Sequence, residues 1–326
     1  MTYRKIAELA GVSLSTVSKA MSGSPEISRA TAERIRKIAE EHHVVGHRYH
    51  KNTADLRVAI VAPEIISVYY SQTITDYVRE LEEKNIDAAV YVADFDAEKA
   101  IRCIERIVLG GEFDGVIAIS CYYPKKSPIP IISDISPKYF DLHLGGDLVC
   151  SDTRSGMLAA MTYLVELGHR DIGFISEKNT SAKLAVFKEN AARLGLSVPP
   201  RYLFVSNKRF QDIGYEAAEH FLHIRRRPTA LIAAYDEAAM GAIHAFRAHG
   251  VDVPGDISVI GINDIPFAAY SNPPLTTIRT YRRENARMIT ELLLERIAEK
   301  TPSVPRQIML SCDLIVRETT APPKGK

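Results

Sequence analysis

The segment "AGVSLSTVSKAMSG" (residues 10–23) decides the fold of the first fifty residues of this 326-residue chain. The residues before Gly11, "YRKIAELA" (3–10), repeat apolar side chains at helical spacing, and the glycine ends this predicted helix. Ser13 then supplies a hydroxyl oxygen that can accept a hydrogen bond from the first amides of a second helix, over residues 14–21. A helix, a tight turn with a glycine and a second short helix are the elements of a helix-turn-helix.

A third helix is predicted to follow, with Ser28 as its N-cap and its end near His42. Thr2 can cap the first helix in the same way. Each of the three helices repeats apolar side chains on one face, so together they can bury a small shared core. The residues expected in this core are Ile6, Leu9, Ala10, Val12, Val17, Ala20, Met21, Ile35, Ile38 and Ala39.

The exposed side of the second helix fits the major groove of DNA. In a helix-turn-helix the N-terminal residues of that helix face the base edges, and hydroxyl and lysine side chains contact bases or phosphates. The residues expected to face DNA are Ser13, Leu14, Ser15, Thr16, Ser18 and Lys19. A helical hairpin with a serine-rich turn is the alternative that these residues alone leave open.

Charge separates the head of the chain from its body. Residues 1–51 hold nine Lys and Arg against five Glu, a net charge of +4, whereas the rest of the chain carries −3. A basic head indicates a polyanionic partner. The sequence has no secretory signal and no apolar run long enough for a membrane, and its four cysteines are scattered. We therefore expect a cytoplasmic protein with no membrane contact, no disulfide framework and no metal site.

The body of the chain alternates strands with helices. Alternation of this kind is typical of parallel sheets with right-handed crossovers, and about 270 residues are many for one sheet. We expect two α/β lobes, with a ligand between them beyond the carboxyl ends of the strands. Strands are predicted at 56–62, 87–93, 115–120, 171–176, 229–234 and 257–262, and helices near 70–84, 97–109, 155–167, 182–194, 212–224 and 236–249.

The head, "YRKIAELAGVSLSTVSKAMSGSPEIS", resembles the N-terminal headpiece of the LacI/GalR family of bacterial transcription regulators. The body resembles that family's effector-binding core, most clearly in "YLVELGHRDIGFIS" (163–176) and "DLIVRETT" (313–320). The resemblance implies a helix-turn-helix headpiece (1–45), a linker (46–56) and an effector-binding and dimerisation domain (57–326). That domain is similar to periplasmic binding proteins, with two α/β lobes of parallel sheets and flanking helices.

The resemblance also assigns roles within the headpiece. Leu14 and Ser15 become the main base-reading pair, and Thr2 and Ser28 join the DNA contacts. Lys19 stands where an arginine is usual, which removes the bidentate fork from that contact.

The linker departs from the family pattern. Gly46 and His47 stand where a Pro-Asn pair is expected, and no leucine occupies the position of the family's minor-groove wedge, although Tyr49 can substitute. Four histidines here raise the alternative of a metal site, but we expect them to add hydrogen bonds and partial charge near phosphates; they are His42, His43, His47 and His50.

The cleft residues follow from the resemblance position by position. Lys183 falls where an arginine is usual, Tyr235 replaces a frequent asparagine, and Asn263 stands where an aspartate is common. The family's aromatic position falls on Phe210 or Arg209. The effector contacts expected are Ser67, Tyr69, Tyr70, Asp152, Lys183, Phe210, Tyr235 and Asn263.

Three departures from the sugar-binding pattern leave the ligand open among a hexose, a glycoside, a sugar phosphate, a nucleoside and another polar metabolite. Two further acids have structural roles in this interpretation: Asp236 as the cap of the helix that it begins, and Asp264 in its own loop. We expect no catalytic residue and no cofactor, because the sequence contains no glycine-rich phosphate loop and no nucleophile with identifiable partners.

The function expected is that of a homodimeric repressor. It would bind a near-palindromic operator with an affinity that a small polar effector, a sugar or sugar derivative, controls. The alternative is a stand-alone sugar-binding protein without DNA function, and a sugar-transforming enzyme is the third hypothesis.

Overall fold

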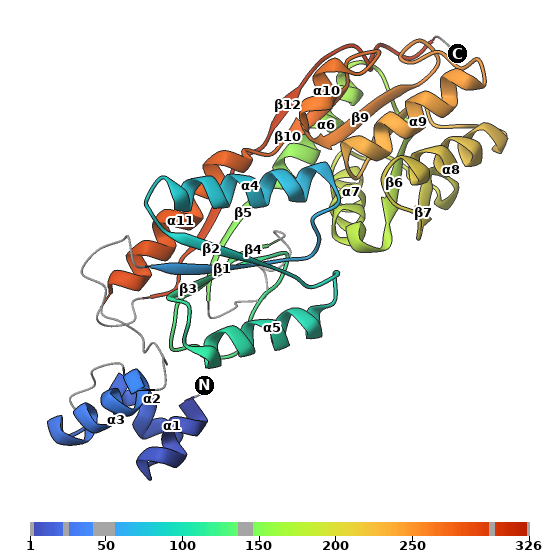
Figure 1. Ribbon diagram of the computed structural model, residues 1–326. Helices are drawn as coiled ribbons and strands as arrows, with labels where there is room; N and C mark the ends of the chain where they lie inside the picture. The colour runs from blue at the N-terminus through green and yellow to red at the C-terminus, as the bar shows by residue number, and fades with distance from the viewer. Residues whose placement is uncertain (1–2, 22–25, 42–55, 136–145, 300–303, 325–326) are drawn as a thin grey trace.

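The computed structural model of the chain describes residues 3–21, 26–41, 56–135, 146–299 and 304–324. Figure 1 shows a small helical headpiece followed by two α/β lobes. The predicted fold class is confirmed, with a helix-turn-helix headpiece and two lobes of parallel sheets with flanking helices. The predicted linker, apart from Leu56, and its four histidines lie outside the described residues.

The headpiece consists of α1 (Tyr3–Ala10), α2 (Leu14–Met21) and α3 (Arg29–Glu41). Gly11 ends α1 with a φ of 63°, a left-handed conformation that glycine adopts without strain. The guanidinium of Arg34 on α3 donates to the carbonyl of Ala10 at 3.0 Å and so ties α3 to the end of α1. One prediction was wrong: Leu9 is 48% exposed, and Tyr3 is buried instead.

The N-terminal lobe is built on a six-stranded, fully parallel sheet in the order β11-β5-β4-β3-β1-β2. Helices α4 and α11 cover one face of this sheet and α5 covers the other. The elements are β1 (Arg57–Ala62), α4 (Val68–Glu82), β2 (Asp87–Val92), α5 (Ala97–Gly110), β3 (Gly115–Ile119), β4 (Ile131–Asp134), β5 (Asp147–Ser151), α11 (Arg282–Ala298) and β11 (Gln307–Leu310).

The C-terminal lobe repeats this plan with the order β12-β10-β9-β8-β6-β7, in which only β12 is antiparallel. Helices α8 and α9 pack on one face, and α6 and α7 pack on the other. The elements are α6 (Thr153–Glu166), β6 (Ile172–Glu177), η3 (Lys178–Thr180), α7 (Ser181–Arg193), η4 (Pro200–Tyr202), β7 (Leu203–Ser206), α8 (Phe210–His223), β8 (Ala230–Ala233), α9 (Asp236–Ala248), β9 (Ser258–Asn263), α10 (Pro266–Tyr270), β10 (Thr276–Arg279) and β12 (Asp313–Ile315).

The chain passes between the lobes three times. It crosses from β5 to α6, from β10 to α11 and from β11 to β12, because the first member of each pair belongs to one lobe and the second to the other. Each lobe has hydrophobic core clusters of its own on the two faces of its sheet, so these connections link two separately packed units.

All six predicted strands are present, and the six predicted helices begin and end within two residues of their predicted bounds. Six further strands and α10 and α11 were missed. The missed strands have three to five residues, too few for a period to emerge from sequence.

Candidate DNA-binding surface and effector pocket

The start of α2 presents the side chains that were predicted to face DNA. Leu14 is 45% exposed although it is apolar, and Ser15 and Ser18 are exposed on the same helix. Thr16 and Lys19 are half-buried beside them. An exposed leucine at this position can contact the methyl group of thymine in the major groove. Thr2 lies outside the described residues.

Two of the predicted DNA-contacting serines cap helices. The hydroxyl of Ser13 accepts a hydrogen bond from the amide of Thr16 at 3.0 Å, and that of Ser28 accepts from the amide of Thr31 at 3.2 Å. Both caps were predicted from sequence and are confirmed. Each capping hydroxyl also forms a hydrogen bond of 2.8 Å with the hydroxyl of the same threonine. The two bonds together fix each serine side chain at the start of its helix.

Lys19 forms an ion pair with Glu26, the residue that precedes the start of α3 by three positions. The side chain of Lys19 is 45% exposed and that of Glu26 is 66% exposed, so solvent screens the pair and it is a weak restraint. A phosphate or a guanine edge would compete with the carboxylate for the ammonium group. In the DNA-free headpiece, therefore, Glu26 partly neutralises a predicted DNA contact.

A pocket of about 400 Å³ lies between the two lobes, at the carboxyl ends of their strands. Both lobes contribute to its walls, and most of the residues that line it have polar side chains, beside several aromatic rings. Seven of the eight predicted effector contacts lie in this lining: Ser67, Tyr69, Tyr70, Lys183, Phe210, Tyr235 and Asn263. Residues from five separate segments of the chain thus meet in one place.

Asp152 is the eighth predicted contact, and it is not in the lining. Its carboxylate accepts a hydrogen bond from the amide of Ser155 at 3.1 Å and so caps α6. Its neighbours Ser151 and Thr153 do line the pocket. The first crossing between the lobes therefore reaches the cavity at this point, with the carboxylate of Asp152 held at the helix end.

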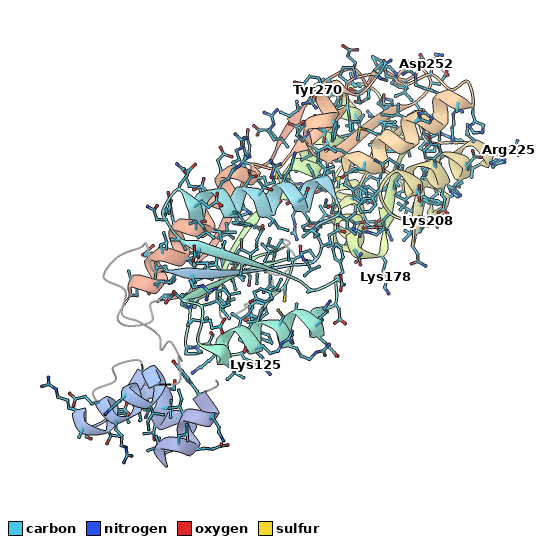
Figure 2. The ribbon with its side chains drawn as sticks, viewed as in Figure 1. Lys125, Lys178, Lys208, Arg225, Asp252 and Tyr270 are labelled. Carbon is cyan, nitrogen blue, oxygen red and sulfur yellow. The ribbon has the colours of Figure 1, made fainter. Side chains whose placement is uncertain are left out.

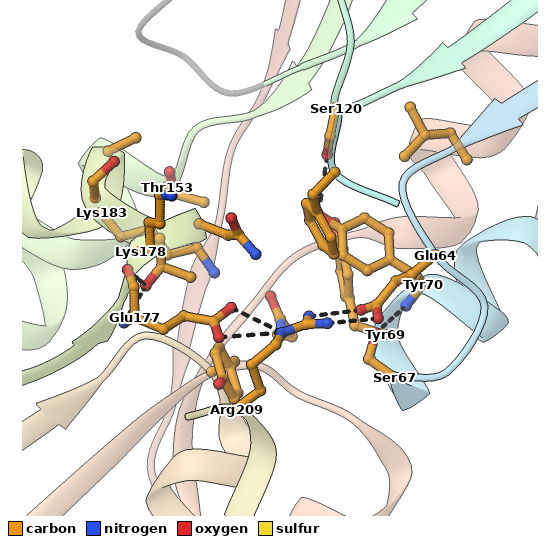
Figure 3. Close-up of a pocket in the computed structure, with 18 of the residues that line it drawn as sticks. Glu64, Ser67, Tyr69, Tyr70, Ser120, Thr153, Glu177, Lys178, Lys183 and Arg209 are labelled. Atoms are coloured by element: carbon orange, nitrogen blue, oxygen red, sulfur yellow. Dashed lines mark hydrogen bonds and ion pairs between the residues drawn. The ribbon is translucent and has the colours of Figure 1, made fainter. Parts of the chain in front are cut away.

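Arg209 occupies the centre of the pocket between two carboxylates (Figure 3). Its terminal nitrogens donate to both carboxylate oxygens of Glu64 at 2.8 and 2.9 Å, and its Nε donates to Glu177 at 3.2 Å. The carboxylates are 6% and 4% exposed. Glu64 follows β1 in the N-terminal lobe, while Arg209 and Glu177 belong to the C-terminal lobe, so this ion pair joins the lobes.

Two aromatic rings lie close to the guanidinium group of Arg209. It lies 4.8 Å from the ring centre of Phe95, from the N-terminal lobe, and 4.6 Å from that of Phe210. Such cation–π contacts strengthen when water is excluded. The hydroxyl of Tyr235 accepts a hydrogen bond from the amide of Phe210 at 3.0 Å and fixes the start of α8. Arg209 is therefore an ordered part of the pocket.

Burial changes the protonation of two other lining groups. It lowers the pKa of Lys183 to about 8, and the ammonium group donates to the carbonyl of Ala234 at 2.7 Å. It raises the pKa of Asp134 to about 6, although hydrogen bonds from Tyr77 and Asn285 favour the charged carboxylate. Perturbed groups that gather in a cleft are typical of functional sites.

Several pocket residues adopt a left-handed backbone conformation that is unusual for side chains other than glycine. Phe95, Ser120 and Phe210 have φ values of 56°, 56° and 57°, and Asn263 has 112°. Each follows or ends a strand and turns its side chain into the cavity wall. Strain of this kind concentrates where function fixes the geometry.

The sequence interpretation missed important lining residues. Glu64 and Glu177 stand at the carboxyl ends of predicted strands, and that position was the signal that could have found them. Asp134 ends β4, a strand that was not predicted. Glu237 follows Asp236 in the first turn of α9, where an acid is ordinary helix chemistry.

The role predicted for Asp236 needs correction. The N-cap of α9 is Tyr235, and no side chain caps that helix end. The fully buried carboxylate of Asp236 instead accepts from the amide of Ile265 at 2.8 Å and from the hydroxyl of Thr277 at 2.5 Å. It joins α9 to the neighbouring loop and strand. Asp264 is also structural, but its partners lie outside its own loop: Arg279 of β10 and Arg317 beyond β12 both donate to it.

Two family descriptions match the chain. Residues 2–45 match "Bacterial regulatory proteins, lacI family", and residues 161–320 match "Periplasmic binding protein-like domain". Within the described part of the chain, none of the helices combines the length and the apolar character that crossing a bilayer demands.

Known proteins with the same architecture cover nearly the whole chain. The HTH-type transcriptional repressor CytR of Escherichia coli (strain K12) is 26% identical over 334 residues, which are 98% of this chain and 96% of the relative. The solved lac repressor dimer bound to operator and the anti-inducer ONPF has a TM-score of 0.72 at 21% identity and covers 98% of this chain and 99% of its own.

A complex of the transcriptional regulator CelR with cellobiose covers the same shares of the two chains, with a TM-score of 0.68 and 23% identity. These structures establish the fold of both domains, and the repressor relative is a regulator rather than an enzyme, as expected from sequence. With its helix-turn-helix headpiece and its two-lobed effector-type domain, the chain belongs to the lacI family of bacterial regulatory proteins.

Proposed function

We propose that the protein is a homodimeric, cytoplasmic repressor whose affinity for a near-palindromic operator is controlled by a small polar effector, a sugar or sugar derivative, in the pocket between the lobes. The observation that carries the proposal is the pocket itself. It joins residues of both lobes, and the same chain carries an exposed recognition helix. A ligand that binds one arrangement of the lobes more tightly shifts their equilibrium toward it.

The coupling to DNA follows from symmetry. Two headpieces in a dimer contact two half-sites, so a change in the relation between lobes alters how well both fit at once. The solved lac repressor is a dimer on its operator, which supports this arrangement for a chain of the same fold. CelR is described with cellobiose, which supports a sugar as the class of ligand.

The pocket chemistry also suits a polar ligand. Hydroxyl groups from Ser67, Tyr70 and Thr180 lie in the lining together with carboxylates, which accept hydrogen bonds, and with Lys183, which donates them. Aromatic side chains supply apolar faces beside these groups, as sugars require. The DNA-contacting and effector-contacting roles of the individual residues are part of this proposal.

Selection from random DNA duplexes with the full chain tests the proposal. The expected product is one palindromic motif, with an affinity that falls steeply as salt rises. Addition of sugars and nucleosides should then change that affinity for at least one compound. Recovery of no motif at moderate salt, with and without these compounds, would overturn the regulatory function and favour a stand-alone binding protein.

A further inference from the structure

We infer that the effector carries no negative charge, and that Glu237 selects it by accepting a hydrogen bond from one of its hydroxyl or amino groups. This inference rests on the proposed function, because it concerns the ligand of the same pocket. It narrows the ligand to a neutral or amino-substituted polyhydroxyl compound and excludes sugar phosphates and sugar acids.

The first observation is that Arg209, the arginine of the pocket, is already paired with two carboxylates of the protein. Arginine is the side chain that most often receives carboxylates and phosphates, through a bidentate fork. In this pocket the fork of Arg209 is filled by Glu64, and its remaining Nε donates to Glu177. A ligand anion would have to displace a buried carboxylate, which would then be left without its cation.

The second observation is the charge of the described lining as a whole. Four carboxyl groups face two half-buried bases, and the further base, Lys178, is exposed and projects outward at the edge of the lobe (Figure 2). Burial weakens one of the two bases, since it lowers the pKa of Lys183 to about 8. The carboxyl groups are Glu64, Asp134, Glu177 and Glu237, and the half-buried bases are Lys183 and Arg209.

The third observation is an oxygen that needs a donor. Glu237 is 4% exposed and lines the pocket, and its Oε1 has no hydrogen-bond partner within the described ranges of the chain. The carboxylate also accepts from the backbone amide of Val68, at the start of α4 in the other lobe. This contact anchors the carboxylate between the lobes, where a ligand that bridges them would meet it.

A buried acceptor without a partner is costly, and a donor from the ligand relieves that cost. A hydroxyl or an ammonium group provides the donor, whereas a carboxylate or phosphate would place a second negative charge against Glu237. Burial raises the pKa of Glu237, and the positive charge of Lys183 opposes that rise. A further positive charge on the ligand would stabilise the ionised carboxylate in the same way.

Binding of chemically matched compounds to the full-length wild-type protein is the first test. Each set holds one scaffold in different charge states: glucose, glucosamine, glucuronate and glucose 6-phosphate; the corresponding galactose set; cellobiose and cellobionate; and adenosine and cytidine with their 5′-monophosphates. Calorimetry at pH 7 should find binding confined to neutral or amino members, at least about tenfold tighter than the anionic member of the set.

Two results would overturn the inference. One is an anionic member that binds as tightly as its neutral counterpart, and the other is a panel in which no neutral or amino member binds. After either result the proposed regulatory function still holds, provided that the protein selects a palindromic operator from random duplexes. Failure of that selection instead removes the proposed function itself.

Substitution of Glu237 is the second test. Glu237→Gln keeps the shape and the oxygen for Val68 but turns an amide donor toward the pocket. We expect roughly 10- to 100-fold weaker binding of the neutral or amino ligand found above, as for loss of a hydrogen bond to a charged group. The control is Glu219→Gln, an exposed position on α8 outside the pocket, with unchanged affinity.

Selectivity separates a ligand contact from a structural role. The ratio of affinities between the neutral and the anionic member of one set should fall in Glu237→Gln, while the circular dichroism spectrum stays at the wild-type value. If both the affinity for the neutral ligand and the ratio of affinities are unchanged in Glu237→Gln, Glu237 does not contact the ligand.

Discussion

Arg209 in the C-terminal lobe donates two hydrogen bonds, of 2.8 and 2.9 Å, to Glu64 in the N-terminal lobe, 145 positions earlier in the chain. The same guanidinium group also contacts Glu177 of its own lobe. If the cleft opened, Arg209 would move away from Glu64, and the Glu64 carboxylate would lose its cation. The ion pair therefore favours the arrangement in which the lobes are close.

Removal of the charge on Glu64 should shift the lobes toward an open state. In Glu64→Gln, Arg209 keeps Glu177 but loses its bidentate partner. We expect a longer distance between fluorescent dyes placed on α5 and α7, and a free energy of unfolding lower by about 1–3 kcal/mol. The distance is measured by single-molecule energy transfer without ligand.

An ion pair at the surface provides the control for this variant. Glu105 pairs with Lys125 on the surface of the N-terminal lobe, and Glu105→Gln should cost about 0–1 kcal/mol and leave the distance unchanged. Equal distances in Glu64→Gln and the wild type would contradict a role of this pair in holding the lobes together.

Release of Lys19 should strengthen operator binding. Glu26→Gln removes the carboxylate that pairs with Lys19, so the ammonium group is freer to contact a phosphate or base. We expect roughly 2- to 10-fold tighter binding at low salt and a log–log salt dependence steeper by up to about one unit. Gel-shift titration at several salt concentrations measures both.

Glu8→Gln removes one negative charge from the same headpiece but frees Lys5 on α1 instead. If both variants tighten binding equally, the gain comes from net charge alone and not from Lys19.

Leu14 and Ser15 should decide which bases are preferred. Truncation of Leu14 to alanine removes the exposed apolar contact at the start of α2, so discrimination at one base position should fall by about 1–3 kcal/mol. Leu9→Ala is a matched control, because Leu9 on α1 is about equally exposed. Sequencing of selected duplexes should show an altered motif for Leu14→Ala only, and identical motifs would refute the assignment.

The buried carboxyl of Asp236 should make stability depend on pH. Burial raises its pKa to about 8, whereas an unfolded aspartate has a pKa of about 3.9, so the folded state holds a proton that the unfolded state loses between these values. The contribution of this group is complete below about pH 4 and declines as pH rises toward 8.

Asp236→Asn abolishes that ionisation while keeping the shape. Urea unfolding across this range should show the stability of the wild type falling relative to the variant as pH rises. The exposed Asp212→Asn in the first turn of α8 is the control, since it alters no buried carboxyl. Parallel pH curves for Asp236→Asn and the wild type would mean that Asp236 stays ionised in the folded protein.

Local sequence predicted the elements whose signals lie within a few residues of one another. The caps at Ser13 and Ser28, the turn at Gly11 and the long amphipathic helices depend on neighbours three or four positions away. The buried strands β1, β3 and β9 emerge as continuous apolar runs because both faces of a parallel sheet are covered. The short strands had no such signal, and the pairing of β11 with β5 joins residues that are far apart in sequence.

By itself, then, the sequence determined the headpiece, the alternation of strands and helices and the positions of seven residues that meet in the cleft. Only the tertiary structure decided the charge state of that cleft. Arg209 could receive a ligand anion if Glu64 and Glu177 did not pair with it, and in the folded chain both of them do. Glu237 stands at the start of a helix, and the fold leaves its Oε1 without a hydrogen-bond partner among the described residues. These are electrostatic relationships between distant segments, which folding alone brings within hydrogen-bonding range.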